Sequence, residues 1–180
     1  MRIFAPSLPV EAPTWWKQAS LYYSTVQNDR HSSVHVYVPP DDGQVTDDTP
    51  GTLRLQLEAS ASGIRVRDGD ARERGRIEAE LPMIVYAMRR DRCRIWKLSA
   101  RSLVLKHHAV QFASGDRWLF HTPWFLWLGI AGVQNGRVRV FGHVGPTKQI
   151  WVLRVDPECD DLDLLSLVAF MHRNWWRPLG

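Results

Sequence analysis

Apolar and polar residues alternate along much of the chain, in short runs that are separated by turn residues. The clearest runs are residues 53–58, 64–67 and 137–141, in which every second side chain is apolar. Because successive side chains of a strand point to opposite faces, this period of two predicts strands with one buried and one solvated face. Asn135 and Gly136, directly before the third run, form the strongest hairpin signal in the chain.

Further strands are predicted where apolar runs lie between turn residues. These runs are residues 34–38, 83–88, 94–98, 103–107, 110–112, 118–120 and 150–155. Residues 39–51 hold four aspartates and three prolines and are expected to form a loop, whereas the charged segment 71–80 is expected to form a loop or a short helix. The segment 124–128 is apolar on both faces, which places it in the core or at a membrane interface.

The last predicted element is a helix over residues 160–176. Asp160 is its expected N-cap, His172 is expected to carry a charge near its C-terminal end, and the eight residues after Asp163 include a single polar side chain, Ser166. A surface helix shows a one-sided apolar stripe, whereas this helix is apolar on nearly every side and therefore has to be enclosed. We predict a mainly β fold, an antiparallel closed or nearly closed β-barrel of about ten to twelve strands around a buried hydrophobic C-terminal helix.

The length of 180 residues fits one domain, with a flexible Pro-rich arm over residues 1–14 and the barrel over residues 15–180. Cys93 and Cys159 form no disulfide framework and match no zinc spacing, so we expect reduced thiols and a cytoplasmic protein. Prolines interrupt the N-terminal residues, which argues against a secretory signal. Residues 118–133 are too short and too polar for a transmembrane span, and peripheral association with a membrane stays open.

The final strand and helix resemble the end of tubby C-terminal-like domains. The resemblance rests on residues 150–157, Ile-Trp-Val-Leu-Arg-Val-Asp-Pro, and on residues 161–171, Asp-Leu-Asp-Leu-Leu-Ser-Leu-Val-Ala-Phe-Met. That superfamily includes the LURP-one-related proteins and the phospholipid scramblases, in which a hydrophobic C-terminal helix threads a closed antiparallel barrel. The resemblance implies this fold and an association with lipid or protein. No functional residue is carried over, and the cysteine cluster that is lipidated in scramblases is missing.

Arginine dominates the positive charge. The formal net charge is +4, and 19 of the 23 basic residues are arginine. This usage fits a GC-rich bacterial genome, and it also fits phosphate groups or lipid headgroups, which a guanidinium group binds bidentately. The candidates for a lipid or anion site are Arg89, Arg90, Arg92, Arg94 and Trp96. The alternative for this segment is a solvated turn between two strands.

Three histidines and three aspartates are the remaining candidates for chemistry. The candidates for an internal cavity are His107, His108 and His121. Because adjacent residues of a strand point to opposite faces, only one of the first two can share a site with the third. The weak candidates for calcium are Asp156, Asp160 and Asp163, around which the glycine and glutamate of an EF-hand are missing. No metal site, cofactor or catalytic motif is predicted.

These observations leave three hypotheses of function. The first is a non-enzymatic intracellular module that binds an anionic lipid headgroup or a protein partner. The second is a small barrel enzyme or ligand carrier, which requires the helix to pack outside the barrel so that a histidine lines a free lumen. The third, nucleic-acid binding through residues 89–94, is the least favoured, because no aromatic RNA-binding motif accompanies the arginines.

Overall fold

The computed structural model describes residues 13–27, 33–41, 51–81, 84–102, 107–121, 129–144 and 150–175, without the side chains of 100–102, 144 and 175. The predicted arm lies almost entirely outside these residues, as do the segment 124–128 and most of the strand predicted at 103–107. The last residue of the predicted helix, at position 176, lies outside them too.

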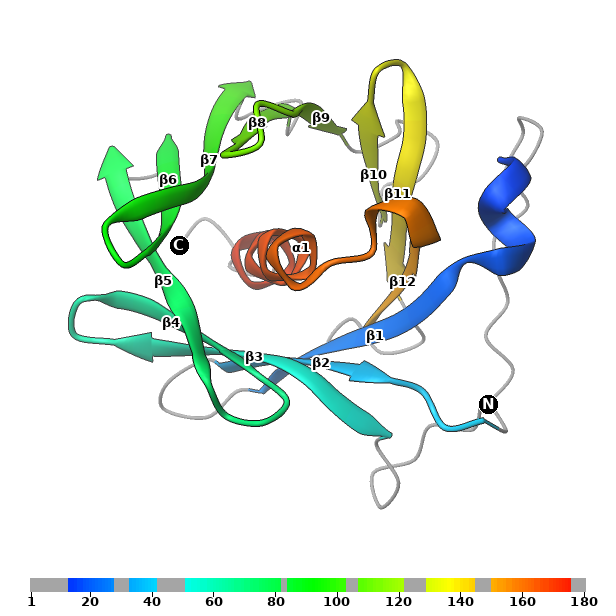
Figure 1. Cartoon of the computed structure of the whole chain (residues 1–180), viewed down its shortest axis with the longest axis horizontal. Helices are drawn as coiled ribbons and strands as arrows, with labels where there is room; N and C mark the ends of the chain where they lie inside the picture. The colour runs from blue at the N-terminus through cyan, green and yellow to red at the C-terminus, as the bar shows by residue number, and fades with distance from the viewer. Residues whose placement is uncertain are drawn as a thin grey trace.

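The described residues form twelve antiparallel strands that close into a barrel, so the predicted fold class is confirmed (Figure 1). Each strand pairs with its neighbours in sequence, and β1 closes the ring by pairing with β12. The strands are β1 (Ser20–Gln27), β2 (Ser33–Val38), β3 (Thr52–Ser60), β4 (Gly63–Asp68), β5 (Glu73–Leu81), β6 (Val85–Arg90), β7 (Cys93–Ser102), β8 (His107–Phe112), β9 (Arg117–His121), β10 (Gly129–Gln134), β11 (Arg137–Val144) and β12 (Ile150–Val155).

The C-terminal helix α1 (Leu162–Trp175) lies inside the barrel. It is seen end-on at the centre of the ring of strands (Figure 1), and it contacts β1, β2, β3 and β7. Every residue from Leu164 to Arg173 is buried, and together these residues cover all sides of the helix. The prediction that a helix apolar on nearly every side has to be enclosed is therefore confirmed.

Ser166, the single polar residue of the apolar run, finds its partner on the barrel wall. The indole Nε1 of Trp96 donates a hydrogen bond of 3.0 Å to its Oγ. The Ser166 hydroxyl in turn lies 2.7 Å from the carbonyl oxygen of Asp163, one turn earlier in the helix. Both side chains are fully buried, so this bond satisfies polar groups that would otherwise destabilise the core.

The start of the helix corrects one prediction. Asp161, not Asp160, is the N-cap, because its Oδ1 accepts a hydrogen bond of 2.6 Å from the backbone N–H of Leu164. The carboxylate of Asp160 instead accepts hydrogen bonds of 2.8 and 2.9 Å from the hydroxyl of Tyr22 on β1. The short helix η2 (Pro157–Cys159) separates α1 from β12 and places the two aspartates at the barrel mouth.

The end of the helix corrects the prediction for His172. His172 is not a solvated charge, because the barrel encloses the last turns and leaves its side chain fully buried. The ring stacks on Trp151 at 4.5 Å between centroids, and its Nδ1 lies 2.8 Å from the hydroxyl oxygen of Ser24. Burial lowers the pKa of His172 to about 3, so the ring is neutral at pH 7.

Residues 73–81 form strand β5, not the loop or short helix that their charge predicts. Only two residues of this strand are buried, Gly75 and Ile77, and they face the barrel interior. Gly75 has φ +151°, and a Cβ at this position would lie 2.4 Å from the carbonyl oxygen of Arg89 on β6. The glycine therefore allows β5 and β6 to approach closely.

A short helix outside the barrel covers part of its wall. In η1 (Thr14–Gln18), the indole Nε1 of Trp15 donates a hydrogen bond of 2.8 Å to the carbonyl oxygen of Val138. Trp16 packs against Phe141, with ring centroids 5.6 Å apart, and the guanidinium of Arg154 lies 4.7 Å from its ring centroid. This segment is thereby fastened to the outer face of β11 and β12.

Candidate functional site

A row of arginines crosses four neighbouring strands at directly paired positions. Arg65 on β4 pairs with Arg76 on β5, Arg76 pairs with Arg89 on β6, and Arg89 pairs with Arg94 on β7. Neighbouring strands lie about 4.8 Å apart, so the backbones of these four arginines lie within roughly 15 Å of one another. The side chains of Arg65, Arg76 and Arg89 are 33–43% exposed, and Arg94 is exposed as well. We call these four residues the arginine row.

Glutamates on β5 partly neutralise the arginine row. The ion pairs with Glu73 are 3.5 Å for Arg65 and 3.0 Å for Arg76, and the pair of Arg89 with Glu80 is 2.7 Å. None of the described residues forms an ion pair with Arg94. Exposed ion pairs contribute only about 0.2–1 kcal/mol each, so these glutamates are weak competitors for an anion that several arginines bind at once.

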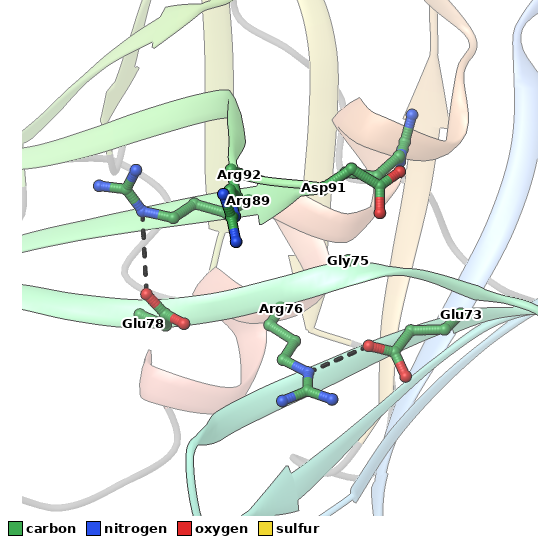
Figure 2. Close-up of a pocket in the computed structure, with 8 residues that line it drawn as sticks. Glu73, Gly75, Arg76, Glu78, Arg89, Asp91 and Arg92 are labelled. Atoms are coloured by element: carbon green, nitrogen blue, oxygen red, sulfur yellow. Dashed lines mark hydrogen bonds and ion pairs between the residues drawn. The ribbon is translucent and has the colours of Figure 1, made fainter.

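A hollow of about 450 Å³ lies beside two residues of the arginine row, Arg76 and Arg89, between β5 and the β6–β7 turn (Figure 2). Its lining residues are Glu73, Gly75, Arg76, Glu78, Arg89, Arg90, Asp91 and Arg92. In Figure 2 the side chains of Arg76 and Arg89 lie on opposite sides of the β5 ribbon near Gly75, and each forms an ion pair with a glutamate of β5. The hollow is therefore lined by guanidinium groups from two strands and one turn.

The turn between β6 and β7 holds Arg92 in an unusual backbone conformation. Asp91 has φ +49° and Arg92 has φ +70°, both in the left-handed region that glycine and asparagine prefer in two-residue hairpins. An arginine costs about 1 kcal/mol in this conformation. The turn places the exposed Arg92 beside the arginine row, and no ion pair joins it to the residues described.

Two of the five residues predicted for the anion site, Trp96 and Arg90, contribute to the fold instead. Trp96 is fully buried in the barrel core and is not accessible to a ligand at the surface. Arg90 donates hydrogen bonds to the carbonyl oxygen of Arg74 and, at 2.7 Å, to Oδ1 of Asp163 on α1. Arg90 thus joins the β6–β7 hairpin to the helix.

The structure brings Arg65 and Arg76, which the sequence analysis missed, beside Arg89 and Arg94. The alternation of residues 64–67 already places Arg65 on the polar face of a strand. Arg76 was hidden because residues 71–80 were expected to form a loop or a short helix. Only the pairing of four strands shows that these arginines are neighbours.

Of the three predicted histidines, His107 and His121 lie on the outer side of the barrel wall, and His108 lies on the inner side. His107 and His121 lie together, with ring centroids 6.2 Å apart in an edge-to-face arrangement. His108 pairs with Phe120, whose side chain is fully buried, and therefore points away from this pair. Burial, followed by the charge of His107, lowers the pKa of His121. The free lumen that the enzyme or carrier hypothesis requires is occupied by α1.

The three candidate calcium ligands are held by separate partners. Asp156 forms an ion pair with Arg139, and Asp163 forms one with Arg90. Asp160 accepts hydrogen bonds from Tyr22, whose pKa is raised to about 12 by burial and by this carboxylate. Among the residues that the structure describes, no three histidine, cysteine, aspartate or glutamate side chains are placed to hold a metal ion.

Comparison of the chain with protein-family models, with curated proteins and with solved structures gave no match. Within the described ranges, no helix is both long enough and apolar enough to cross a membrane.

Proposed function

We propose that the protein is a non-enzymatic, tubby-like binding module whose arginine row engages an anionic lipid headgroup. The observation that carries the proposal is the direct pairing of Arg65, Arg76, Arg89 and Arg94 across four strands. Like charges at directly opposite positions destabilise a sheet. Their presence at four successive positions is therefore better explained by a ligand than by stability.

The chemistry of the arginine row suits phosphate. A guanidinium group presents a planar fork of donors that binds phosphate oxygens bidentately. The hollow of about 450 Å³ beside the row falls within the range of about 300–1,000 Å³ that is typical of small-ligand sites. Arg92 supports the proposal further, because a costly backbone conformation in an exposed turn is a common feature of functional sites.

The architecture supports a role in binding at the outer surface. The helix takes up the interior of the barrel, so a ligand is left with the outer wall and the loops. The same arrangement of barrel and helix is the one that the resemblance to tubby C-terminal-like domains and scramblases implies. Within this proposal the protein works in the cytoplasm and associates peripherally with membranes.

Co-sedimentation with vesicles tests the proposal. The wild-type protein should pellet with vesicles that contain phosphatidylserine or a phosphomonoester lipid, and it should stay in the supernatant with neutral phosphatidylcholine vesicles. The variant Arg76→Gln/Arg89→Gln should bind the anionic vesicles about 10- to 30-fold more weakly, since each basic residue near an anionic surface contributes about 1 kcal/mol. The matched control is Arg117→Gln/Arg137→Gln, which removes two exposed charges outside the arginine row.

Each other outcome has a clear meaning. Negligible binding of the wild type to both kinds of vesicle would overturn the lipid proposal and favour a protein partner. Equal losses in the two double variants would show a general charge effect and remove the arginine row as the site. Binding to DNA or RNA that weakens steeply with salt would favour the nucleic-acid hypothesis instead.

A further inference from the structure

The β8–β9 hairpin places two histidines beside each other. The register pairs His108 with Phe120, and one position further along the same ladder His107 faces His121. His107 also pairs with Ser102 of β7, and His121 pairs with Ala131 of β10. Four neighbouring strands therefore hold the backbones of the two histidines in fixed positions.

We propose that His107 and His121 form a site for a divalent transition-metal ion on the outer wall of the barrel. The pair lies on the opposite side of β8 and β9 from the buried side chains of Val110, Trp118 and Phe120. The site therefore lies outside the core.

The two rings lie within about 1 Å of the separation that one shared tetrahedral ion requires. Imidazole nitrogens bind zinc at about 2.0–2.1 Å, which places the centroids of two histidines on one tetrahedral ion roughly 5 Å apart. The observed separation is 6.2 Å. Binding of a shared ion therefore requires the two rings to approach each other by about 1 Å.

The bonding of His121 also suits a ligand. No hydrogen bond from any described residue reaches its Nδ1, which is enclosed. A histidine binds a metal through a nitrogen lone pair and in its neutral form. A bound ion would satisfy a polar atom that otherwise stays unpaired.

The chemistry of the pair selects the class of ion. Imidazole suits Zn²⁺, Ni²⁺ and Cu²⁺, whereas Mg²⁺ and Ca²⁺ prefer oxygen ligands. Two protein ligands leave coordination positions for water or for a donor from a second molecule. The site uses β8 and β9, and it does not depend on the arginine row of β4–β7.

Isothermal titration calorimetry tests the proposal on the full chain without a polyhistidine tag. The titrants are ZnCl₂ and NiCl₂, and MgCl₂ is the negative control. The wild type should bind one Zn²⁺ or Ni²⁺. Both His107→Gln and His121→Gln should lose about 10²-fold in affinity, because a second ligand held nearby strengthens binding by about that factor. The matched control is His35→Gln on β2, which removes a half-buried histidine outside the pair and should keep wild-type affinity.

Selective ¹⁵N labelling of histidine provides a second measurement, which detects the bound ion in the wild type itself. Of the seven histidines, two should show large ring-nitrogen shifts when Zn²⁺ is added, and the His107→Gln and His121→Gln spectra should assign them. Zn²⁺ that shifts other histidines, or wild-type affinity in either variant of the pair, would overturn the proposal. Failure of the wild type to bind Zn²⁺ or Ni²⁺ at millimolar concentration would overturn it as well.

Discussion

At the scale of single residues, His172 shows how enclosure changes an ionisable group. The same ring at an exposed helix end would be charged in mild acid and would interact favourably with the helix dipole. Inside the barrel it contacts Trp151 and the Ser24 hydroxyl, and burial lowers its pKa to about 3 from the usual 6.5. The residue type and its position in the helix were visible in the sequence, but its surroundings were not.

We expect His172 to make the protein sensitive to acid. Between pH 6.5 and pH 3 the unfolded chain binds a proton at this position and the folded chain does not, so the free energy of unfolding falls as the pH falls. At pH 4 the expected loss is about 3 kcal/mol, at 1.36 kcal/mol per pH unit. Urea unfolding at pH 7 and pH 4 measures this loss.

The variant His172→Phe should remove this part of the pH dependence, because phenylalanine keeps the stacking on Trp151 and takes up no proton. Between pH 7 and pH 8 the histidine is neutral in both states, so there the wild type and the variant should respond to pH in parallel. An equal loss of stability at pH 4 in both proteins would show that other groups cause the acid sensitivity.

The arginines show what local sequence can and cannot predict at this scale. Arg89, Arg92 and Arg94 lie within six residues of one another, and their cluster is visible by eye. Arg65 and Arg76 join them only through the register of β4, β5 and β6, which depends on pairing between strands. Trp96 lies in the same short segment but points into the core, because its place in β7 directs it inward.

At the scale of elements, alternation predicted the strands whose inward positions carry large apolar residues. In β3 these positions are Leu55 and Leu57, and in β4 they are Ile64 and Val66, all of them buried. In β5 one inward position is Gly75, so the strand lacks a large apolar residue that the alternating pattern requires. The many charged residues of the segment indicate a loop instead. The helix was predicted for the opposite reason, since its apolar run is almost uninterrupted.

Gly75 gives a prediction for the β5–β6 pair. In Gly75→Ala the new Cβ would lie 2.4 Å from the carbonyl oxygen of Arg89, at a φ of +151° that other residues rarely adopt. We expect a loss of about 3 kcal/mol or more in the free energy of unfolding, from backbone strain and steric overlap together. Thermal or urea unfolding measures it.

The matched control for this change is Gly136→Ala in the β10–β11 turn. Gly136 also has a positive φ, +75°, but a Cβ there would meet no atom within 4 Å. The control should lose only about 1 kcal/mol, the cost of the left-handed conformation alone. Similar losses at the two positions would contradict the close approach of β5 and β6.

At the scale of the whole molecule, the fold consists of a closed wall and a helix that fills it, and neither part is complete alone. The ring of β1 to β12 leaves no open sheet edge among the described strands. The apolar inner side chains of the strands, such as Leu57, Trp96 and Leu153, belong to one core cluster with the helix residues Leu167 and Phe170. Removing the helix therefore exposes the inner wall.

A chain that ends before Asp160 should be insoluble or unfolded. The milder variant Phe170→Ala should fold but lose about 3–5 kcal/mol in the free energy of unfolding, because the cavity it leaves lies between Tyr86 and Trp96. Leu119→Ala on the outer wall, where the side chain is 37% exposed, is the control and should change stability by less than about 0.5 kcal/mol. Sedimentation and circular dichroism measure the solubility and the melting transition of the truncated chain. A truncated chain that stays soluble with an unchanged melting transition would contradict the filled-barrel structure.

The pairing of β1 with β12, together with the position of α1 after β12, has a consequence for the protein during its synthesis. The ribosome makes the first wall strand early, but its closing partner and the helix that fills the barrel emerge only after ten further strands. At about 5–20 residues per second, the nascent chain carries uncovered apolar strand faces for on the order of ten seconds. We therefore expect the nascent chain to be a substrate for chaperones that bind exposed apolar segments, and a chain whose translation stalls before α1 cannot complete its core.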